Sequence, residues 1–478
     1  MNYRMICRTL GSVLSCLAVL LFLPLIAGLC HGENVLGFAV TIGVTGGISL
    51  GLKQVKPRST DIYAREGFVI VGLAWICMSM LGALPFVISG DIPNYIDALF
   101  ETVSGFTTTG ASILNNVENM SRGGLFWRSF THWIGGMGVL VFVMAVLPMS
   151  GDHSMHIMRA EVPGPTVGKL VPRAKETAKI LYLIYMGMTA VETVLLMCGG
   201  LSFFDALLHA FATAGTGGFS TKAASVGAFN SVYVEMVISV FMLLFSVNFN
   251  LYYLLLIGRL KDVLKNEELH WFLCIVLFAV FTIALNISGI YGGFDTALRH
   301  AFFNVSSIIS TTGFGTMDFN LWPAYSRWLL VLLMLLGACA GSTGGGIKIS
   351  RFIMLVKSIR AELRQMIRPR SVVRVQLEGK RVETGAVKAV NTFFVLYIFI
   401  LLACTLLISL DGCDMTTNLT AALACLSNIG PGMSMVGPTG NYAFFSYFAK
   451  MVLSLAMLIG RLEIYPSLLL FSRHTCKR

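Results

Sequence analysis

Four short segments of the chain share a pattern of small polar residues followed by glycine, and such a pattern can coordinate a cation. A dehydrated cation requires a cage of oxygen atoms, and a loop of small residues can turn its backbone carbonyls inward where glycine permits a positive φ. The candidate ion-coordinating residues are Thr108, Thr109, Gly110, Thr216, Gly217, Thr311, Thr312, Gly313, Asn428, Ile429 and Gly430.

The spacing of these segments indicates an internal repeat. Their glycines lie 107, 96 and 117 residues apart, and each segment falls between two long apolar runs. A single glycine in an apolar segment usually serves close helix packing, but four in matching positions indicate a repeated unit. A short helix should precede each glycine and direct its negative C-terminal end at the cation. The expected caps of these helices are Asp97, Asp205, Asp295 and Thr417.

The composition requires a membrane protein, because 56% of the 478 residues are hydrophobic and only 12% are charged. Runs of about 20 apolar residues recur along the chain, which is the length that crosses a bilayer. We predict about ten spans, near 9–30, 35–52, 67–90, 124–148, 177–199, 230–258, 270–290, 326–368 (interrupted), 383–410 and 442–471.

These elements predict an all-α polytopic membrane protein with four tandem membrane-pore-membrane repeats. A two-helix hairpin at 1–56 should precede repeats at 57–160, 161–262, 263–372 and 373–478. Each repeat crosses the membrane twice, so all four loops enter from the same side and can surround one pseudo-fourfold pore. A carrier built from inverted repeats would place its halves in opposite orientations.

Basic residues lie mainly in alternate connections, which hold 28 of the 35 Lys and Arg, eleven of them in 348–388. The positive-inside bias therefore predicts a multi-pass protein with both termini in the cytoplasm. The net charge of +11 does not indicate nucleic-acid binding, because the basic residues come in separate bursts. The sequence has no catalytic constellation, so we do not expect an enzyme. It also has no nucleotide-binding motif, so we expect regulation by a separate cytosolic protein that docks on 348–388.

At these residues the chain resembles the TrkH/TrkG/KtrB superfamily of potassium transporters, nearly from end to end. The resemblance implies potassium uptake across the inner membrane by a homodimer with one pore per subunit, embedded in membrane lipid. It also implies a cytosolic regulatory subunit of the TrkA type that binds the nucleotide, so that this chain itself binds no cofactor. The residues that match the filter glycines of the family are Gly110, Gly217, Gly313 and Gly430.

A second mark of the family is the segment 337–348, which reads GACAGSTGGGIK and is similar to a loop that gates the pore below the filter. Glycine destabilises a helix by about 1 kcal/mol relative to alanine, so the helix should break at 339–346. Such a loop must face protein or water, and we expect few packing contacts to hold it, so that it can move. The candidate gate residues are Gly341, Gly344, Gly345, Gly346, Lys348 and Arg461. A phosphate-binding loop is excluded, because Ile347 precedes Lys348 and Ile349 follows it.

Arg461 is a candidate gate residue because a charged side chain within a membrane span is costly and usually functional. The resemblance implies that it projects into the pore beneath the filter, and the alternative is an ion pair with Glu463 or with a helix neighbour. Two other functions also fit the predicted spans. One is an ion-coupled carrier that moves potassium with protons or sodium, and the other is a membrane anchor that conducts nothing.

Overall fold

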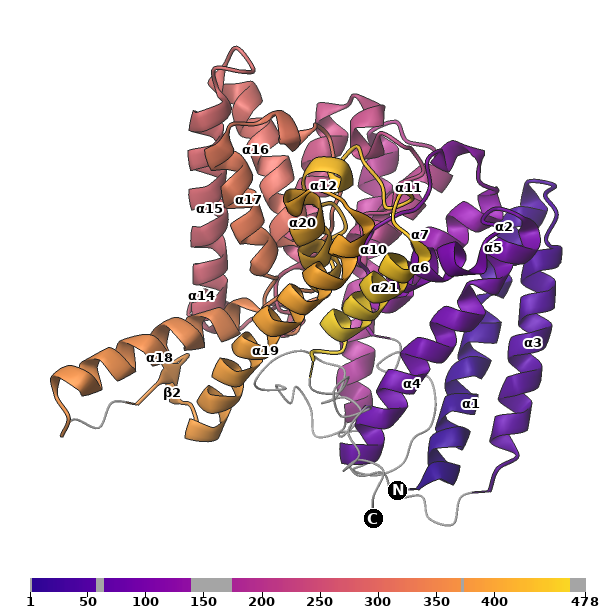
Figure 1. Ribbon diagram of the computed structural model, residues 1–478, viewed down its shortest axis with the longest axis horizontal. Coiled ribbons are helices and arrows are strands. Elements are labelled where there is room, and N and C mark those ends of the chain that lie inside the picture. The colour runs from indigo at the N-terminus through magenta and orange to yellow at the C-terminus, as the bar shows by residue number, and fades with distance from the viewer. Residues whose placement is uncertain (1, 57–63, 139–173, 371–373, 465–478) are drawn as a thin grey trace.

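The computed structural model describes all residues except 1, 57–63, 139–173, 371–373 and 465–478. The described part is mostly helical, with only two very short strands, which confirms the predicted all-α class (Figure 1). Two-residue strands, β1 (Gln376–Leu377) and β2 (Lys380–Arg381), form one small antiparallel hairpin. Single turns of 3-10 helix are η1 (Val117–Asn119), η2 (Ser225–Phe229), η3 (Phe319–Leu321), η4 (Ser409–Asp411) and η5 (Ser434–Val436).

The chain begins with a helical hairpin. Helix α1 (Tyr3–Leu20) continues into α2 (Phe22–Cys30), and α3 (Leu36–Lys53) returns along α1. The two arms approach closely where Gly11 lacks a side chain, and Ser49 Oγ donates a hydrogen bond of 2.7 Å to the Gly11 carbonyl. Small residues at a helix contact allow this approach in a membrane, where apolar surface gives no driving force between helices.

Four consecutive units follow, each with a long helix, a short helix, a loop and a second helix. The first unit holds α4 (Ala64–Gly82), α5 (Leu84–Ser89), α6 (Tyr95–Phe106) and α7 (Arg122–Gly136), and the second holds α10 (Ala174–Cys198), α11 (Phe203–Ala214), α12 (Val232–Phe245) and α13 (Phe249–Leu256). After α14 (Leu260–Leu264), the third holds α15 (Glu267–Ile287), α16 (Phe294–Ile309), α17 (Ala324–Leu335) and α18 (Ile349–Ile367), and the fourth holds α19 (Thr384–Ile408), α20 (Met415–Leu426) and α21 (Tyr447–Arg461).

Packing between the units is cyclic. The second helix of each unit contacts the short helix of the next, so that α7 packs on α11, α12 on α16, and α17 on α20. Helix α21 of the last unit packs on α6 of the first and completes the cycle. The four short helices α6, α11, α16 and α20 thereby surround a common centre.

Six helical segments of the described chain are long and apolar enough to cross a membrane: Tyr3–Cys30, Leu36–Lys53, Glu66–Ser89, Ala178–Cys198, Glu267–Ile287 and Thr384–Asp411. The pair α12 and α13 would add a seventh if it counts as one span. Helix α17 is shorter because the loop 336–348, here called the glycine-rich loop, interrupts the span predicted at 326–368. The spans predicted at 124–148 and 442–471 extend beyond the described residues.

The prediction of one continuous span at 230–258 is wrong, because α12 and α13 meet at an angle of 92°. Asn248 caps α13 by accepting a hydrogen bond from a backbone N–H two residues further along. The glycine-rich loop supplies partners for the backbone groups at this break. Cys339 N donates to the Ser246 carbonyl, and Phe249 N donates to the Gly341 carbonyl, each at 3.0 Å. The break therefore depends on a segment almost 100 residues away in sequence.

The predicted caps of the short helices are also wrong by a few residues. Asp97, Asp205 and Thr417 occupy the third helical position and Asp295 the second. The observed N-caps are Asn94, Ser202, Gly293 and Asp414. In α11, Ser202 Oγ accepts a hydrogen bond from Asp205 N at 3.1 Å, as an N-cap does, and donates one to the Asp205 carboxylate at 2.8 Å. The acidic residues still lie in the first turn, where the helix dipole favours them.

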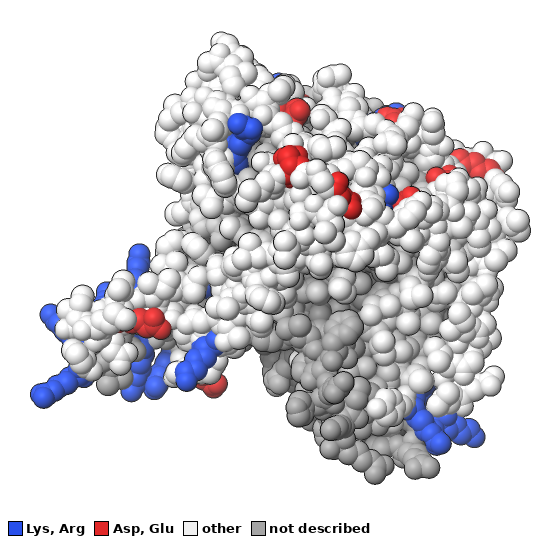
Figure 2. All heavy atoms as spheres, viewed as in Figure 1, with Lys and Arg blue, Asp and Glu red and all other residues white. Residues whose placement is uncertain are grey.

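Basic and acidic residues on the face shown in Figure 2 gather mainly at opposite ends of the molecule. Figure 2 shows Lys and Arg on the projecting arm formed by α18 and the β hairpin, and near the end at which α1 begins. Most Asp and Glu on this face lie at the opposite end.

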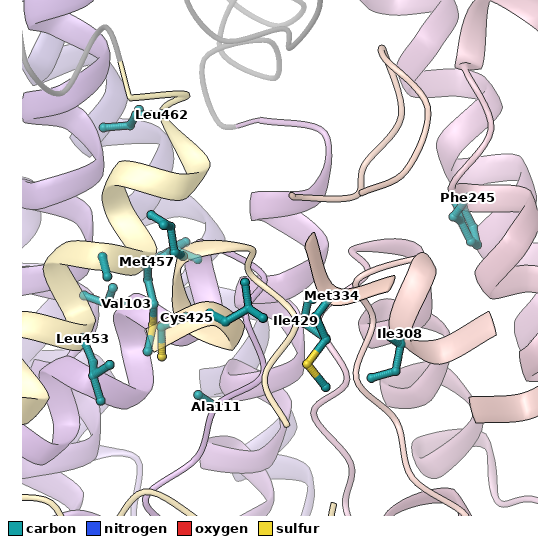
Figure 3. Packing of buried hydrophobic residues seen from close by; sticks show 14 of the residues in the cluster. Val103, Ala111, Phe245, Ile308, Met334, Cys425, Ile429, Leu453, Met457 and Leu462 are labelled. Carbon is teal, nitrogen blue, oxygen red and sulfur yellow. The ribbon is translucent and has the colours of Figure 1, made fainter. Parts of the chain in front are cut away.

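Buried apolar side chains surround the ends of the short helices (Figure 3). Val103 of α6, Ile308 of α16 and Cys425 of α20 are buried there, together with Ala111 and Ile429 from the loops that follow the short helices. Close packing of this kind holds the loops in one arrangement.

Candidate ion pathway

The four short helices end in the same backbone turn, and the residues of these turns, 107–110, 215–218, 310–313 and 427–430, are here called the ring loops. In each loop a non-glycine residue adopts a left-handed φ of 55° to 59°: Thr108, Thr216, Thr311 and Asn428. The next residue donates its N–H to the carbonyl five residues back, at 2.8 to 3.0 Å, as in a Schellman motif. A left-handed β-branched residue is a genuine outlier, and such strain is concentrated at functional sites.

The second ring loop corrects one predicted residue. The predicted glycine, Gly217, lies one position too early to match Gly110, because the left-handed glycine of this loop is Gly218, with a φ of 75° against 81° for Gly110. Gly217 corresponds instead to Thr109. The loop reads Gly-Thr-Gly-Gly, so either of its last two glycines can be aligned with the glycine of the other repeats, and only the backbone conformation decides between the two alignments.

The ring loops contact one another in a closed cycle. A Cβ atom placed on any of the four left-handed glycines would overlap the carbonyl oxygen of the next unit, whereas real Cβ atoms stay beyond about 3.0 Å. The distances would be 2.0 Å from Gly110 to Gly217 O, 2.1 Å from Gly218 to Thr312 O, 2.0 Å from Gly313 to Ile429 O and 2.6 Å from Gly430 to Thr109 O. Glycine is therefore required at all four positions, and the four carbonyls form a ring.

Side chains of the fourth unit hold this ring in place. Tyr442 Oη donates a hydrogen bond of 2.7 Å to the Gly430 carbonyl. Asn428 Nδ2 donates to Thr109 Oγ1 and to the Met457 carbonyl, each at 3.0 Å. The oxygens of the ring can replace the hydration shell of a cation, and the C-terminal ends of four helices add negative potential there.

A cavity of about 140 Å³ opens on one side of the ring and is lined by Gly110, Gly218, Gly313 and Gly430. Other residues of its wall include Ser112, Asn115 and Ser220. Among the described residues, no group of three or more His, Cys, Asp or Glu side chains is placed to hold a metal ion. The ring itself offers backbone and hydroxyl oxygens.

The glycine-rich loop lies against the other side of the ring. As predicted, it is not helical, and Gly341 and Gly346 have left-handed φ values of 71° and 65°. Gly345 N donates a hydrogen bond of 2.7 Å to Thr311 Oγ1 of the third ring loop. A Cβ atom on Gly345 would lie 2.6 Å from the Ser427 carbonyl of the fourth. The loop therefore contacts both the third and the fourth ring loops.

The expectation that few contacts hold this loop is wrong. Thr343 Oγ1 donates to the Phe245 carbonyl at 3.1 Å, and Lys348 Nζ donates to the Gly344 carbonyl. Glu268 Oε1 accepts hydrogen bonds from the backbone N–H of residue 340, within the loop, and of residue 350, in the first turn of α18, at 2.8 and 2.9 Å. Backbone that is not helical must find such partners at membrane depth, which explains why a glycine-rich segment here is tightly held.

Arg461, at the end of α21, bridges the glycine-rich loop and the first unit. Its guanidinium donates to the Thr343 carbonyl at 2.9 Å and to the carbonyls of Gly135 and Gly136 at 2.5 and 2.9 Å. Glu463, the alternative partner, forms an ion pair with Arg351. A cavity of only about 60 Å³ remains here, and its wall includes Gly344, Gly345, Gly346, Lys348 and Arg461.

Three buried charged residues of this region were missed by sequence analysis: Glu101, Arg128 and Glu268. Glu101 and Arg128 form an ion pair of 2.6 Å beside the ring loops, and Glu268 joins the glycine-rich loop to the first turn of α18. The available signal is the one that selects Arg461, a charge within an apolar segment.

The family model described as "TrkH: Cation transport protein" matches residues 31–475. The chain belongs to the TrkH family. It is 36% identical over 481 residues to the Trk system potassium uptake protein TrkH of Salmonella typhimurium, and 34% identical over 479 residues to that of Halomonas elongata, with 99% of each chain covered. It is 35% identical over 422 residues to the Trk system potassium uptake protein TrkG of Escherichia coli, covering 87% of this chain and 86% of TrkG.

The fold agrees with this assignment. The crystal structure of the potassium transporter TrkH from Vibrio parahaemolyticus matches the whole of this chain with a TM-score of 0.89 at 32% identity. The TrkH family transports potassium and is not a family of enzymes, so the chain is an integral membrane transporter. The predicted resemblance is confirmed. The predicted repeat boundaries near residues 56, 160 and 372 lie at or within stretches outside the described residues.

Proposed function

We propose that the chain takes up potassium across the cytoplasmic membrane through a channel-like pore whose selectivity filter is the carbonyl ring. The observation that carries this proposal is the closed cycle in which each left-handed glycine faces a carbonyl of the next unit. The printed names of the relatives support potassium as the ion. The proposed filter residues are Thr108, Thr109, Gly110, Thr216, Gly217, Gly218, Thr311, Thr312, Gly313, Asn428, Ile429 and Gly430.

The ring suits a weakly hydrated monovalent cation. Four backbone carbonyls can replace water ligands without an ionised side chain in the ring, so the ion is bound weakly enough to leave. The hydrogen bonds of the four Schellman turns and of Tyr442 limit the movement of these carbonyls. A ring of fixed size then favours one ion radius over another.

The proposed gate is the glycine-rich loop, with Gly341, Gly344, Gly345, Gly346 and Lys348, together with Arg461. The described arrangement corresponds to a closed pore, because the loop contacts two ring loops and Arg461 adds a fixed positive charge below them. Each neutral hydrogen bond contributes about 0.5–1.5 kcal/mol, and each one to a charged group about 1.5–3 kcal/mol. Opening therefore costs several kcal/mol, and a partner that shifts the gate from 1:99 to 99:1 must supply about 5.5 kcal/mol.

Helix α18 is the proposed site at which a regulator supplies this energy. It begins directly after the glycine-rich loop and projects from the body with a cluster of basic residues (Figure 2). We propose that a cytosolic regulatory subunit of the TrkA type, which carries the nucleotide, docks on this arm. The same charge distribution supports cytoplasmic placement of both termini. The assembly is proposed to be a homodimer in membrane lipid, with one pore per subunit.

The deciding experiment is potassium-limited growth of an uptake-deficient host that expresses the full chain, followed by single-channel recording of the purified protein in bilayers. A pore should restore growth and give discrete currents. Growth with saturable flux that depends strictly on protons or sodium, and without channel currents, would favour the carrier. Neither growth nor flux, at normal membrane expression, would favour the anchor and refute the proposal.

A further inference from the structure

Glu101 lies in the middle of α6, and its carboxylate holds the chain where it leaves the first ring loop. Its side chain is 0% exposed. Oε1 accepts a hydrogen bond from Ser112 Oγ at 3.0 Å, and Oε2 accepts one from Ile113 N at 2.9 Å. Ser112 and Ile113 lie two and three residues after Gly110, so these bonds determine the path of the chain directly beyond the ring.

Arg128 of α7 extends this contact to the second ring loop. Its Nε donates to Glu101 Oε1 at 2.6 Å, and its Nη1 donates to the Ser220 carbonyl at 3.0 Å. Its guanidinium carbon lies 3.6 Å from the centre of the Phe219 ring. Phe219 and Ser220 directly follow Gly218. One buried ion pair therefore holds the exits of two adjacent ring loops.

The position of Glu101 differs between the four units. Counted back six positions from the C-cap of each short helix, the equivalent residues are Glu101, His209, Asn304 and Ala421. His209 Nε2 contacts Ser220 Oγ at 2.9 Å, which repeats the contact between Glu101 and Ser112. In the third and fourth units, the position of Ser112 is occupied by glycine, Gly315 and Gly432. The short helices of these two units contact the loop exits through hydroxyls instead: Ser307 Oγ donates to the Phe314 carbonyl at 2.6 Å, and Thr420 Oγ1 accepts from Met433 N at 2.9 Å. A carboxylate at this position is therefore particular to the first unit.

We propose that Glu101 and Arg128 are positioning residues that hold the first two ring loops at the spacing required for potassium and thereby set its selectivity over sodium. This inference rests on the proposed function of the ring as a filter. Stability alone does not explain the pair, because an apolar replacement of a buried ion pair is often equally stable or more stable. Bonds to charged groups are short and directional, and here they fix three atoms in the exits of two loops.

The test compares Glu101→Gln, Arg128→Lys and Arg128→Gln in the full chain, expressed in the uptake-deficient host. The readout is the ratio of initial potassium and sodium uptake rates in the same cells, which does not depend on the amount of protein. We expect each variant to lower this ratio about tenfold, equivalent to about 1.4 kcal/mol. Arg128→Lys decides between geometry and charge, since lysine keeps the charge but lacks the planar fork that binds two partners.

A purely electrostatic role predicts a different pattern. Arg128→Gln would then remove a repulsive charge from the cavity above the ring and raise uptake of both ions, while Arg128→Lys would behave as wild type. An unchanged uptake ratio in all three variants would overturn the inference. If the uptake-deficient host takes up no potassium when it expresses the wild-type chain, the proposed function itself is refuted, so the two failures are distinct.

The matched control is the ion pair between Asp97 and Lys450, at 2.7 Å, which joins the same helix α6 to α21. Its hydrogen bonds do not involve the exits of the ring loops. Lys450→Met should lower the amount of folded protein and leave the uptake ratio within about twofold of wild type. An equal loss of selectivity in this control would mean that any loosening of α6 disturbs the ring, and the specific role of Glu101 and Arg128 would be refuted.

Discussion

Replacing Gly313 by alanine should remove most of the discrimination between potassium and sodium, because the new methyl group would overlap a ring carbonyl. At the φ of 84° found here, an L-residue costs roughly 1–2 kcal/mol. The Cβ atom would lie 2.0 Å from the Ile429 oxygen, whereas real Cβ atoms keep about 3.0 Å. The carbonyl must therefore move by about 1 Å. We expect at least a tenfold loss in the uptake ratio, which is about 1.4 kcal/mol.

The control is Gly292→Ala in the same unit. Gly292 also has a left-handed φ, of 66°, but an added Cβ atom would meet nothing within 4 Å. This variant has the backbone cost without the steric overlap, so it should lower stability slightly and keep wild-type selectivity. The assay is paired potassium and sodium uptake in one batch of cells, with folded protein measured by size-exclusion chromatography. Wild-type selectivity in Gly313→Ala, or an equal loss in Gly292→Ala, would refute the filter assignment.

The remaining predictions concern the second ring loop and the gate. Gly218→Ser should lower the potassium to sodium uptake ratio about as much as Gly313→Ala, because its Cβ atom would lie 2.1 Å from the Thr312 oxygen; wild-type selectivity would contradict the corrected register. Arg461→Ala should raise single-channel conductance by removing a positive charge from the cation path, and an unchanged conductance would place Arg461 outside it. Deletion of 341–345 should raise liposome flux without any regulator, whereas a passive kink predicts flux per folded protein at or below wild type. Glu268→Ala should do the same more weakly, since it removes the acceptor of one backbone N–H in the glycine-rich loop, at residue 340, and of one in the first turn of α18, at residue 350; basal flux equal to wild type would argue against this role.

The ring and the interrupted span could be predicted from the sequence because both depend on local backbone chemistry. Glycine is recognisable wherever the chain needs a left-handed φ, and four such positions at similar spacing identify a repeat. Gly341 and Gly346 mark the helix break for the same reason. Each of these features is determined by residues close to it in the sequence.

Features that depend on distant partners could not be predicted in this way. The break between α12 and α13 is stabilised by carbonyl and N–H groups of the glycine-rich loop, so the local sequence around Asn248 reads as one continuous span. The register of the second ring loop depends on which of two adjacent glycines faces Thr312. The role of Glu101 depends on Arg128 and Ser220, which lie 27 and 119 residues further along the chain.

The contacts between gate and filter have a consequence for transport. Thr311 occupies a strained left-handed position in the third ring loop, and its hydroxyl accepts the hydrogen bond from Gly345 of the glycine-rich loop. In the proposed mechanism, opening of the loop breaks this bond, so the proposed gate and the third ring loop cannot change independently. The pair of Glu101 and Arg128 lies in the first unit and holds the exits of the first and second ring loops. In the proposed mechanism, the contact of this pair with the first two ring loops need not break when the gate opens, whereas the third and fourth ring loops touch the glycine-rich loop and lose that contact.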